Sequence, residues 1–127
     1  MSKQINLQMV YKLSFIFGLL VLFSCKTDVK PQENIKVEQL EGKWLMHQGF
    51  RSGNRSKLLD NAYFEFLPAN QMRTNIMGDE EPIKFKFENG TILTVNDKYY
   101  VTKLTSDTLI LNAHLKNFDF KFITVKK

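Results

Sequence analysis

The sequence predicts an all-β protein, a small antiparallel barrel of eight strands that follow one another in sequence order. After Gly42, short apolar and polar alternations recur about every 8 to 12 residues, separated by turn-forming residues. No segment of this part has the period of about 3.6 residues that is typical of a long helix. The clearest strand is the segment 83–88, in which every second residue is apolar and which an Asn-Gly dipeptide follows directly.

The first 24 residues have the layout of an export signal. Lys3 and Lys12 stand in a part without acidic residues, and an apolar run follows over 13–23. The run is about eleven residues long, whereas a helix needs roughly 20 to cross the hydrocarbon core of a bilayer. We therefore predict a signal peptide over 1–24 rather than a permanent transmembrane helix.

The apolar run ends in Leu22-Phe23-Ser24-Cys25, which resembles the lipobox of bacterial lipoproteins. In proteins with that motif the cysteine receives a diacylglyceryl group, the preceding peptide is removed and the new amino terminus is acylated. The resemblance implies that Cys25, the only cysteine, is the lipid-attachment residue; the alternative is an incidental free thiol. It also implies an exported protein anchored to a bacterial cell-envelope membrane, expected to be the outer membrane, with the leaflet left open.

A tether is predicted over 25–36, between the lipid and the folded domain. The residues after Cys25 are polar, include Pro31 and have neither a period of 2 nor one of about 3.6. Fully extended, they reach roughly 35 to 40 Å. The domain is then expected over 37–127, a length that is sufficient for one hydrophobic core.

Turn-forming residues divide the predicted domain into eight strands. Pro68-Ala69-Asn70 separates the second from the third, and Asn96-Asp97 and Ser106-Asp107 bound the sixth. Such strands most economically close into an up-and-down barrel, because closure removes both exposed edges; a wrapped open sheet is the alternative. The predicted strands are 42–50, 62–67, 71–77, 83–88, 91–95, 98–104, 108–113 and 117–125.

Two details of strand pairing follow from the pattern. A type I′ turn at Asn89-Gly90 sets Phe87 opposite Ile92, so Ile92 should face the same way as the aromatic residues of 83–88, Ile83 included. The strand 98–104 cannot alternate strictly throughout. If Tyr99 and Val101 face inward, Leu104 faces outward although it resembles a core residue, which a β-bulge near Lys103 would reconcile.

The start of the domain, Val37-Glu38-Gln39-Leu40-Glu41-Gly42-Lys43-Trp44, places a short apolar turn before Gly-x-Trp. This motif resembles the N-terminal signature of lipocalins and of the smaller bacterial lipocalin-like lipoproteins. The resemblance, over 37–127, implies that Gly42 lets the chain bend closely into the barrel and that Trp44 plugs its closed end. The chain lacks the Thr-Asp-Tyr signature of larger lipocalins and their last-strand arginine, for which Lys121 or Lys126 would have to substitute.

Aromatic and cationic residues form the candidate ligand site. The aromatic side chains could line a cup for an apolar ligand or simply fill the interior, since short strands enclose little volume. Arg51 and Arg55, in the long loop 51–60, could attract a carboxylate or a phosphate or could merely be solvated. The aromatic candidates are Phe64, Phe66, Phe85, Phe87, Tyr99, Phe118 and Phe120.

These features favour a binding or interaction protein over an enzyme. His47 and His114 are isolated, so no metal site, cofactor or catalytic residue is expected. The formal net charge of +5 falls to +3 without the predicted signal peptide, and the remaining acids and bases are interspersed, so nucleic acid is not an expected partner. One hypothesis is a barrel that binds a small apolar or amphipathic molecule, and the alternative is a filled barrel with a surface-interaction or structural role. A monomer is expected.

Overall fold

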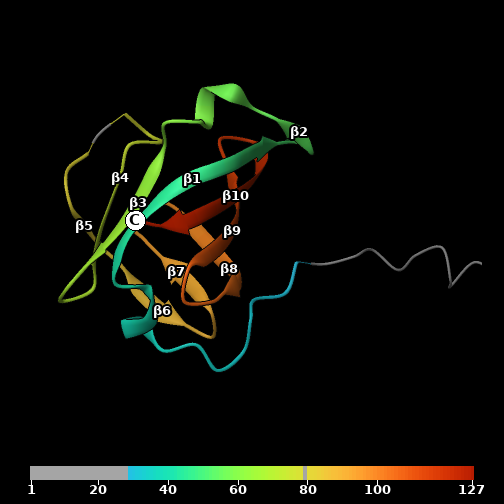
Figure 1. Ribbon diagram of the computed structural model, residues 1–127. Helices are drawn as coiled ribbons and strands as arrows, with labels where there is room; N and C mark the ends of the chain where they lie inside the picture. The colour runs from blue at the N-terminus through green and yellow to red at the C-terminus, as the bar shows by residue number, and fades with distance from the viewer. Residues whose placement is uncertain (1–28, 79) are drawn as a thin grey trace, which may run out of the picture.

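The computed structural model describes residues 29–78 and 80–127, and these residues form a nearly closed antiparallel β-barrel (Figure 1). The predicted signal peptide and Cys25 lie outside the described residues. The 3-10 helix η1 (Val37–Leu40) precedes the first strand, and η2 (Lys57–Leu59) follows the second. The strands are β1 (Gly42–Arg51), β2 (Asn54–Arg55), β3 (Tyr63–Leu67), β4 (Gln71–Thr74), β5 (Ile83–Lys84), β6 (Lys86–Glu88), β7 (Thr91–Leu93), β8 (Lys98–Leu104), β9 (Thr108–Leu115) and β10 (Phe118–Lys126).

Strand β1 lies in the middle of the sheet and pairs with β3 on one side and β10 on the other. From β10 the order continues through β9, β8 and β7 to β6, and from β3 it continues through β4 to β5. The two outermost strands, β5 and β6, are consecutive parts of one extended segment, 83–88. The sheet therefore closes through this segment, whose first half pairs with β4 and whose second half pairs with β7.

The prediction of an all-β barrel is confirmed, and the predicted number of eight strands is wrong. The described residues contain ten strands, because β2 forms a small extra hairpin with the end of β1 and because 83–88 divides in two. The division falls at Phe85, whose N–H donates to the carbonyl oxygen of Asn70 at 2.9 Å. Because the pleat is interrupted there, Ile83 is 44% exposed instead of facing inward, whereas Phe85 is buried.

The third predicted strand, 71–77, ends earlier, at Thr74. The side chain of Asn75 accounts for this end. Its Oδ1 accepts a hydrogen bond from the N–H of Tyr63 at 3.0 Å, and its Nδ2 donates to the carbonyl oxygen of Asn61 at 3.1 Å. An Asn side chain thus occupies the position of a further backbone pair, and the chain leaves the sheet.

The predicted hairpin register is confirmed. Phe87 pairs with Ile92 across the turn, and both turn residues have positive φ, 50° for Asn89 and 73° for Gly90. These angles suit a type I′ turn, which glycine and asparagine adopt most readily. Ile92 is fully buried, as the predicted pairing requires.

The predicted irregularity in strand 98–104 is also present. Val101 pairs with Leu111 and Lys103 with Ile110, so Thr102 is an extra residue on β8. The extra residue shifts the alternation by one position, and Leu104 packs against the core.

The interior is filled with large side chains over most of its length. The rings of Tyr99 and Phe122 lie 5.7 and 5.1 Å from the Phe64 ring, measured between centroids. All three side chains are 2% exposed or less. Other fully buried residues, from six elements, belong to the same core: Leu40, Trp44, Met72, Ile92, Val101, Leu109 and Leu111. Such packing leaves no room for a ligand among these rings.

The last part of the predicted tether is attached to the barrel, and we call residues 30–36 the N-terminal strap. The N–H of Gln32 donates to the carbonyl oxygen of Val101 at 2.7 Å, and Gln32 Oε1 accepts from the N–H of Leu104 at 2.8 Å. Ile35 packs against the core. The prediction of a free tether up to residue 36 is therefore wrong for this part. The strap partners the stretch of β8 that extends beyond β7.

Candidate functional site

The two ends of the barrel differ, and Trp44 is buried at the end beside η1. The indole is fully buried, and its N–H donates to the carbonyl oxygen of Leu40 at 2.8 Å. Lys126 Nζ lies 4.8 Å from the centroid of the Trp44 ring and donates to the carbonyl oxygen of Glu41. A buried indole needs such an acceptor, so this geometry fits the plug expected of Trp44.

Gly42 allows the close approach of chains at this closed end. Its φ is 119°, and a Cβ built on it would lie 2.8 Å from Cε of Lys126. Lys126 is one of the two lysines considered as substitutes for a last-strand arginine, and it is the one beside Trp44. Lys121, the other, lies on the outer wall with Phe50 and Ile123.

The opposite, open end contains an apolar hollow of about 240 Å³. Phe122, fully buried, forms its floor, and Phe118, 43% exposed, lies at its rim. The guanidinium carbon of Arg51 lies 4.9 Å from the centroid of the Phe118 ring. Residues from the ends of β1, β9 and β10, from η2 and from the segment after β4 line the hollow: Arg51, Leu59, Ile76, Met77, Leu115, Lys116, Phe118, Phe120 and Phe122.

The size of the hollow limits what it can hold. Pockets for drug-sized ligands commonly measure about 300 to 1,000 Å³, and an apolar cavity of about 150 Å³ suffices for benzene. A hollow of about 240 Å³ thus has room for one aromatic ring or a short branched alkyl group. Any polar part of such a molecule would remain at the rim, next to Arg51 and Lys116.

The structure places only part of the predicted cup at this hollow. Phe120, Phe118 and Arg51 line it, whereas Phe64 and Tyr99 are packed in the core below. The remaining predicted residues lie elsewhere in the barrel: Phe66 and Phe85 pack edge to face with centroids 5.7 Å apart, and Phe87 packs against the core. Burial also raises the pKa of Tyr99 above its ordinary range, so its phenol remains neutral.

Arg55 does not line the hollow. Its Nη2 lies 3.0 Å from Oδ1 of Asp60, and both side chains are more than two-fifths exposed. The pair joins the two halves of the loop 51–60, so the guanidinium is already engaged by a carboxylate. An exposed pair of this kind contributes little to stability, about 1 kcal/mol or less.

Sequence reasoning missed several residues that line the hollow: Leu59, Ile76, Met77, Leu115 and Lys116. For Leu115 a signal existed, because the alternation of Leu109, Leu111 and Ala113 continues to it, and β9 does extend that far. Leu59 and Ile76 lie outside the strands, where no period marks an inward residue.

Gly49 determines how closely η2 covers the hollow. A Cβ built on Gly49 would lie 2.6 Å from Cβ of Leu59, so only glycine leaves room for that leucine. The carbonyl oxygen of Gly49 also accepts a hydrogen bond from the N–H of Ser56 at 2.8 Å. The position of Leu59 in the wall of the hollow therefore depends on the glycine beneath it.

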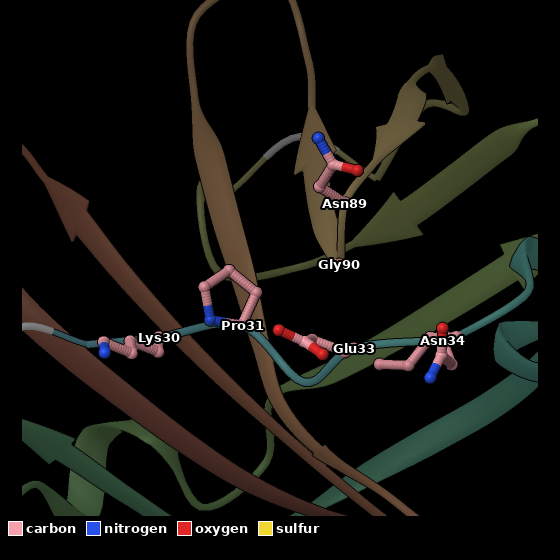
Figure 2. Close-up of a pocket in the computed structure, with 7 residues that line it drawn as sticks. Lys30, Pro31, Glu33, Asn34, Asn89 and Gly90 are labelled. Carbon is pink, nitrogen blue, oxygen red and sulfur yellow. The ribbon is translucent and has the colours of Figure 1, made fainter.

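A second, larger hollow of about 620 Å³ lies between the strap and the turn that joins β6 to β7. Figure 2 shows Asn89 and Gly90 at the tip of the turn and Lys30, Pro31, Glu33 and Asn34 along the strap. Lys30, Glu33 and Asn34 are exposed, and only Pro31 and Ile35 present sizeable apolar groups. This surface has no enclosed apolar wall, so it is the weaker candidate for an apolar ligand.

Two further titratable side chains are hydrogen-bonded to carboxylates. His114 Nδ1 lies 2.7 Å from Oδ1 of Asp119 across the β9–β10 hairpin, with both side chains exposed. The Tyr63 hydroxyl donates to Oε1 of Glu80 at 2.6 Å, and this bond raises the pKa of Tyr63 to about 12. Within 29–78 and 80–127, no three His, Cys, Asp or Glu side chains are grouped closely enough to hold a metal ion.

Comparison with known proteins gives no family for this chain. Neither a scan against protein-family models nor a search of curated proteins finds a match to this chain. In the part of the chain that the structure describes, no helix has the length and apolar character needed to span a membrane. The nearly closed antiparallel barrel is compatible with a lipocalin-like fold.

Proposed function

We propose that this chain is a membrane-anchored, lipocalin-like lipoprotein that binds a small apolar molecule with an anionic group at the open end of its barrel. The observation that carries the proposal is the hollow of about 240 Å³ with apolar walls and two cations at its rim. Apolar walls favour a ring or an alkyl group, and a guanidinium favours a carboxylate or a phosphate.

The depth of the hollow determines how a ligand would lie. Phe122 is fully buried and packs against Phe64 below it, so the apolar group would rest on this ring and go no deeper. Arg51 stacks on Phe118 at the rim, which holds the guanidinium next to the opening. The anionic group would then remain partly in water, where an ion pair costs little desolvation.

The lipid anchor is a separate part of the proposal, and Cys25 carries it. The expected consequence is an exported protein held on the outer membrane by its amino-terminal lipid. Labelling of cells with radioactive palmitate tests this part. Incorporation should be lost in the Cys25→Ala variant, and label retained in that variant would refute attachment at Cys25.

The alternative function is a surface-interaction or structural role of a barrel without a small-molecule ligand. The filled interior favours this alternative, since Trp44, Phe64, Tyr99 and Phe122 occupy the space below the hollow. The two proposals differ in whether the hollow at the open end binds a small molecule. A binding experiment must therefore perturb the hollow itself and leave the packed interior unchanged.

Calorimetric titration with a matched pair of small molecules tests binding. Phenylbutyrate and phenylbutanol share a ring and a chain, and they differ in the anionic group. We expect Ile76→Trp to abolish binding of both by filling the hollow, whereas Ile83→Trp, the same change on the outer wall, leaves binding unchanged. Arg51→Gln should weaken phenylbutyrate by about fivefold to tenfold and leave phenylbutanol unaffected.

Two results would contradict the proposal. Equal binding of phenylbutyrate to the wild type and to Ile76→Trp would place the ligand outside the hollow. Absence of heat for both molecules, and for homologues with shorter and longer chains, would favour the filled-barrel alternative. Thermal unfolding of each variant establishes that the barrel remains folded.

A further inference from the structure

Four of the eight large apolar side chains that are exposed in the described residues lie around the open end of the barrel. Leu58 in η2 is 91% exposed and Val95 in the β7–β8 turn is 97% exposed. Met77 and Phe118, which also line the hollow, are 41% and 43% exposed. Exposed apolar side chains that gather on one face and are rimmed by polar residues mark a surface that binds a partner or a membrane.

Strand pairing places these four tips at one end of the barrel. Met77 and Phe118 lie together at the hollow, and Leu58 is adjacent to Leu59 in its wall. Tyr99 pairs with Ala113, so the turn before Tyr99, which holds Val95, is on the same side as the β9–β10 turn. We call Leu58, Met77, Val95 and Phe118 the apolar tips.

Cations stand between the apolar tips. Lys57 precedes Leu58, Lys98 follows the turn that holds Val95, and Arg51 and Lys116 lie at the hollow beside Phe118. Two acids of this end are engaged, Asp60 by Arg55 at 3.0 Å and Asp119 by His114 at 2.7 Å. Glu80 and Glu81 follow Met77 by three and four positions and line a surface hollow with Tyr63 and Arg73, and Asp97 adjoins Lys98.

The turns 68–70 and 105–107 at the closed end hold no exposed large apolar side chain and no cation. The two turns consist of Pro, Ala, Asn, Thr, Ser and Asp, and all six residues are exposed. Among the described residues, the other large apolar side chains that are exposed lie at the start of the described chain or on the wall of the barrel: Val29, Leu45, Ile83 and Val125. Leu58 and Val95 are thus the most exposed of the large apolar side chains in the described residues, and both lie at the open end.

We propose that the open end of the barrel docks on the surface of an anionic lipid bilayer, with the apolar tips in the interface and the cations on lipid phosphates. A lipid surface explains the mixture better than a protein partner does, because the centres of protein interfaces are depleted in lysine. At a bilayer, apolar side chains enter the headgroup region while Lys and Arg contact anionic lipids. The docking concerns the loops and does not depend on a ligand in the hollow.

The test uses the full chain with Cys25→Ala and one new cysteine that carries a polarity-sensitive dye. Leu58→Cys and Val95→Cys place the dye at the open end, and Pro68→Cys and Ser106→Cys place it at the closed end. The vesicles contain phosphatidylcholine and phosphatidylglycerol, with brominated acyl chains as quenchers. We expect strong quenching and a blue shift at 58 and 95, with neither at 68 and 106.

Charge-reversal variants separate docking from simple proximity to the vesicle. Lys57→Glu and Lys116→Glu should each lower the vesicle partition coefficient, measured by the quenching at 95, by about thirtyfold, because each replaces a cation near an anionic surface with an anion, a change of two charges. Lys84→Glu, on the outer wall, is the matched control and should leave it unchanged. Equal quenching at all four positions, or none at 58 and 95, would overturn lipid docking; in the second case the apolar tips would be left for a protein partner.

Discussion

Gln32 is expected to stabilise the whole barrel, although it lies in a segment whose sequence is typical of a linker. In Gln32→Ala the N–H of Leu104 loses its acceptor, Oε1 of Gln32 at 2.8 Å, in a partly buried position. An N–H left without a partner there costs about 1 to 3 kcal/mol. The backbone hydrogen bond from Gln32 to Val101 does not involve the side chain, so the strap itself should stay in place.

Urea unfolding followed by the fluorescence of Trp44, the only tryptophan, measures this loss. With a slope of about 1 to 3 kcal/mol per molar urea, a loss of 2 kcal/mol moves the midpoint by roughly 1 M. Gln39→Ala is the matched control, because Gln39 Oε1 accepts from the N–H of Lys36 at the same 2.8 Å but in an exposed position. That variant should lose less than about 1 kcal/mol. Equal effects of the two substitutions, or no effect of Gln32→Ala, would refute the role given to the strap.

Three further outcomes are expected. Trp44→Phe should lower the free energy of unfolding by about 1 to 3 kcal/mol, since the carbonyl oxygen of Leu40 loses its donor in a buried site, and chemical denaturation followed by circular dichroism measures this. Phe122→Ala should cost about 3 to 5 kcal/mol and should deepen the hollow, so that titration detects binding of ligands with longer chains. Tyr63 should ionise near pH 12 in an ultraviolet titration and nearer its usual value of 10.0 in Glu80→Gln. Because the folded-state pKa is raised, the stabilisation from this bond should be present below pH 10 and be lost as the pH rises through about 12.

The parts of the fold that local sequence determines were predictable. The Asn-Gly turn requires positive φ at both positions, and this requirement alone fixes Phe87 opposite Ile92. The bulge in β8 was predictable from Leu104. Strict alternation from Tyr99 and Val101 would make this leucine face outward, and one extra residue in the strand turns it toward the core.

The errors arose where pairing between distant segments overrides local pattern. Ile83 follows the alternation of its strand, but that strand changes partner at Phe85 to close the sheet. Gln32 bonds with β8, some 70 positions further along the chain, and its flanking polar residues give no sign of this. Such contacts depend on the completed barrel, which alternation and turn chemistry do not describe.

The candidate site was predictable in kind and only partly in position. The alternation of apolar and polar residues correctly predicted that Phe64, Tyr99 and Phe120 face inward. It does not predict the height along the barrel axis at which each ring lies. The rings at middle height pack against one another, and those at the open end line a hollow. Leu59 completes its wall because Gly49 leaves it room, a steric relation that no pattern of apolar residues reveals.

Native mass spectrometry tests the central claim, that the open end holds a small apolar ligand, most directly. The chain from residue 29 onward, expressed in bacteria and purified without detergent, should carry a bound small molecule, and collisional activation should release an anionic species. The same preparation of Ile76→Trp should show only the mass of the protein, while Ile83→Trp should retain the ligand. Bare protein in all three preparations, even after incubation with phenylbutyrate, would contradict the claim, as would the same bound mass in all three.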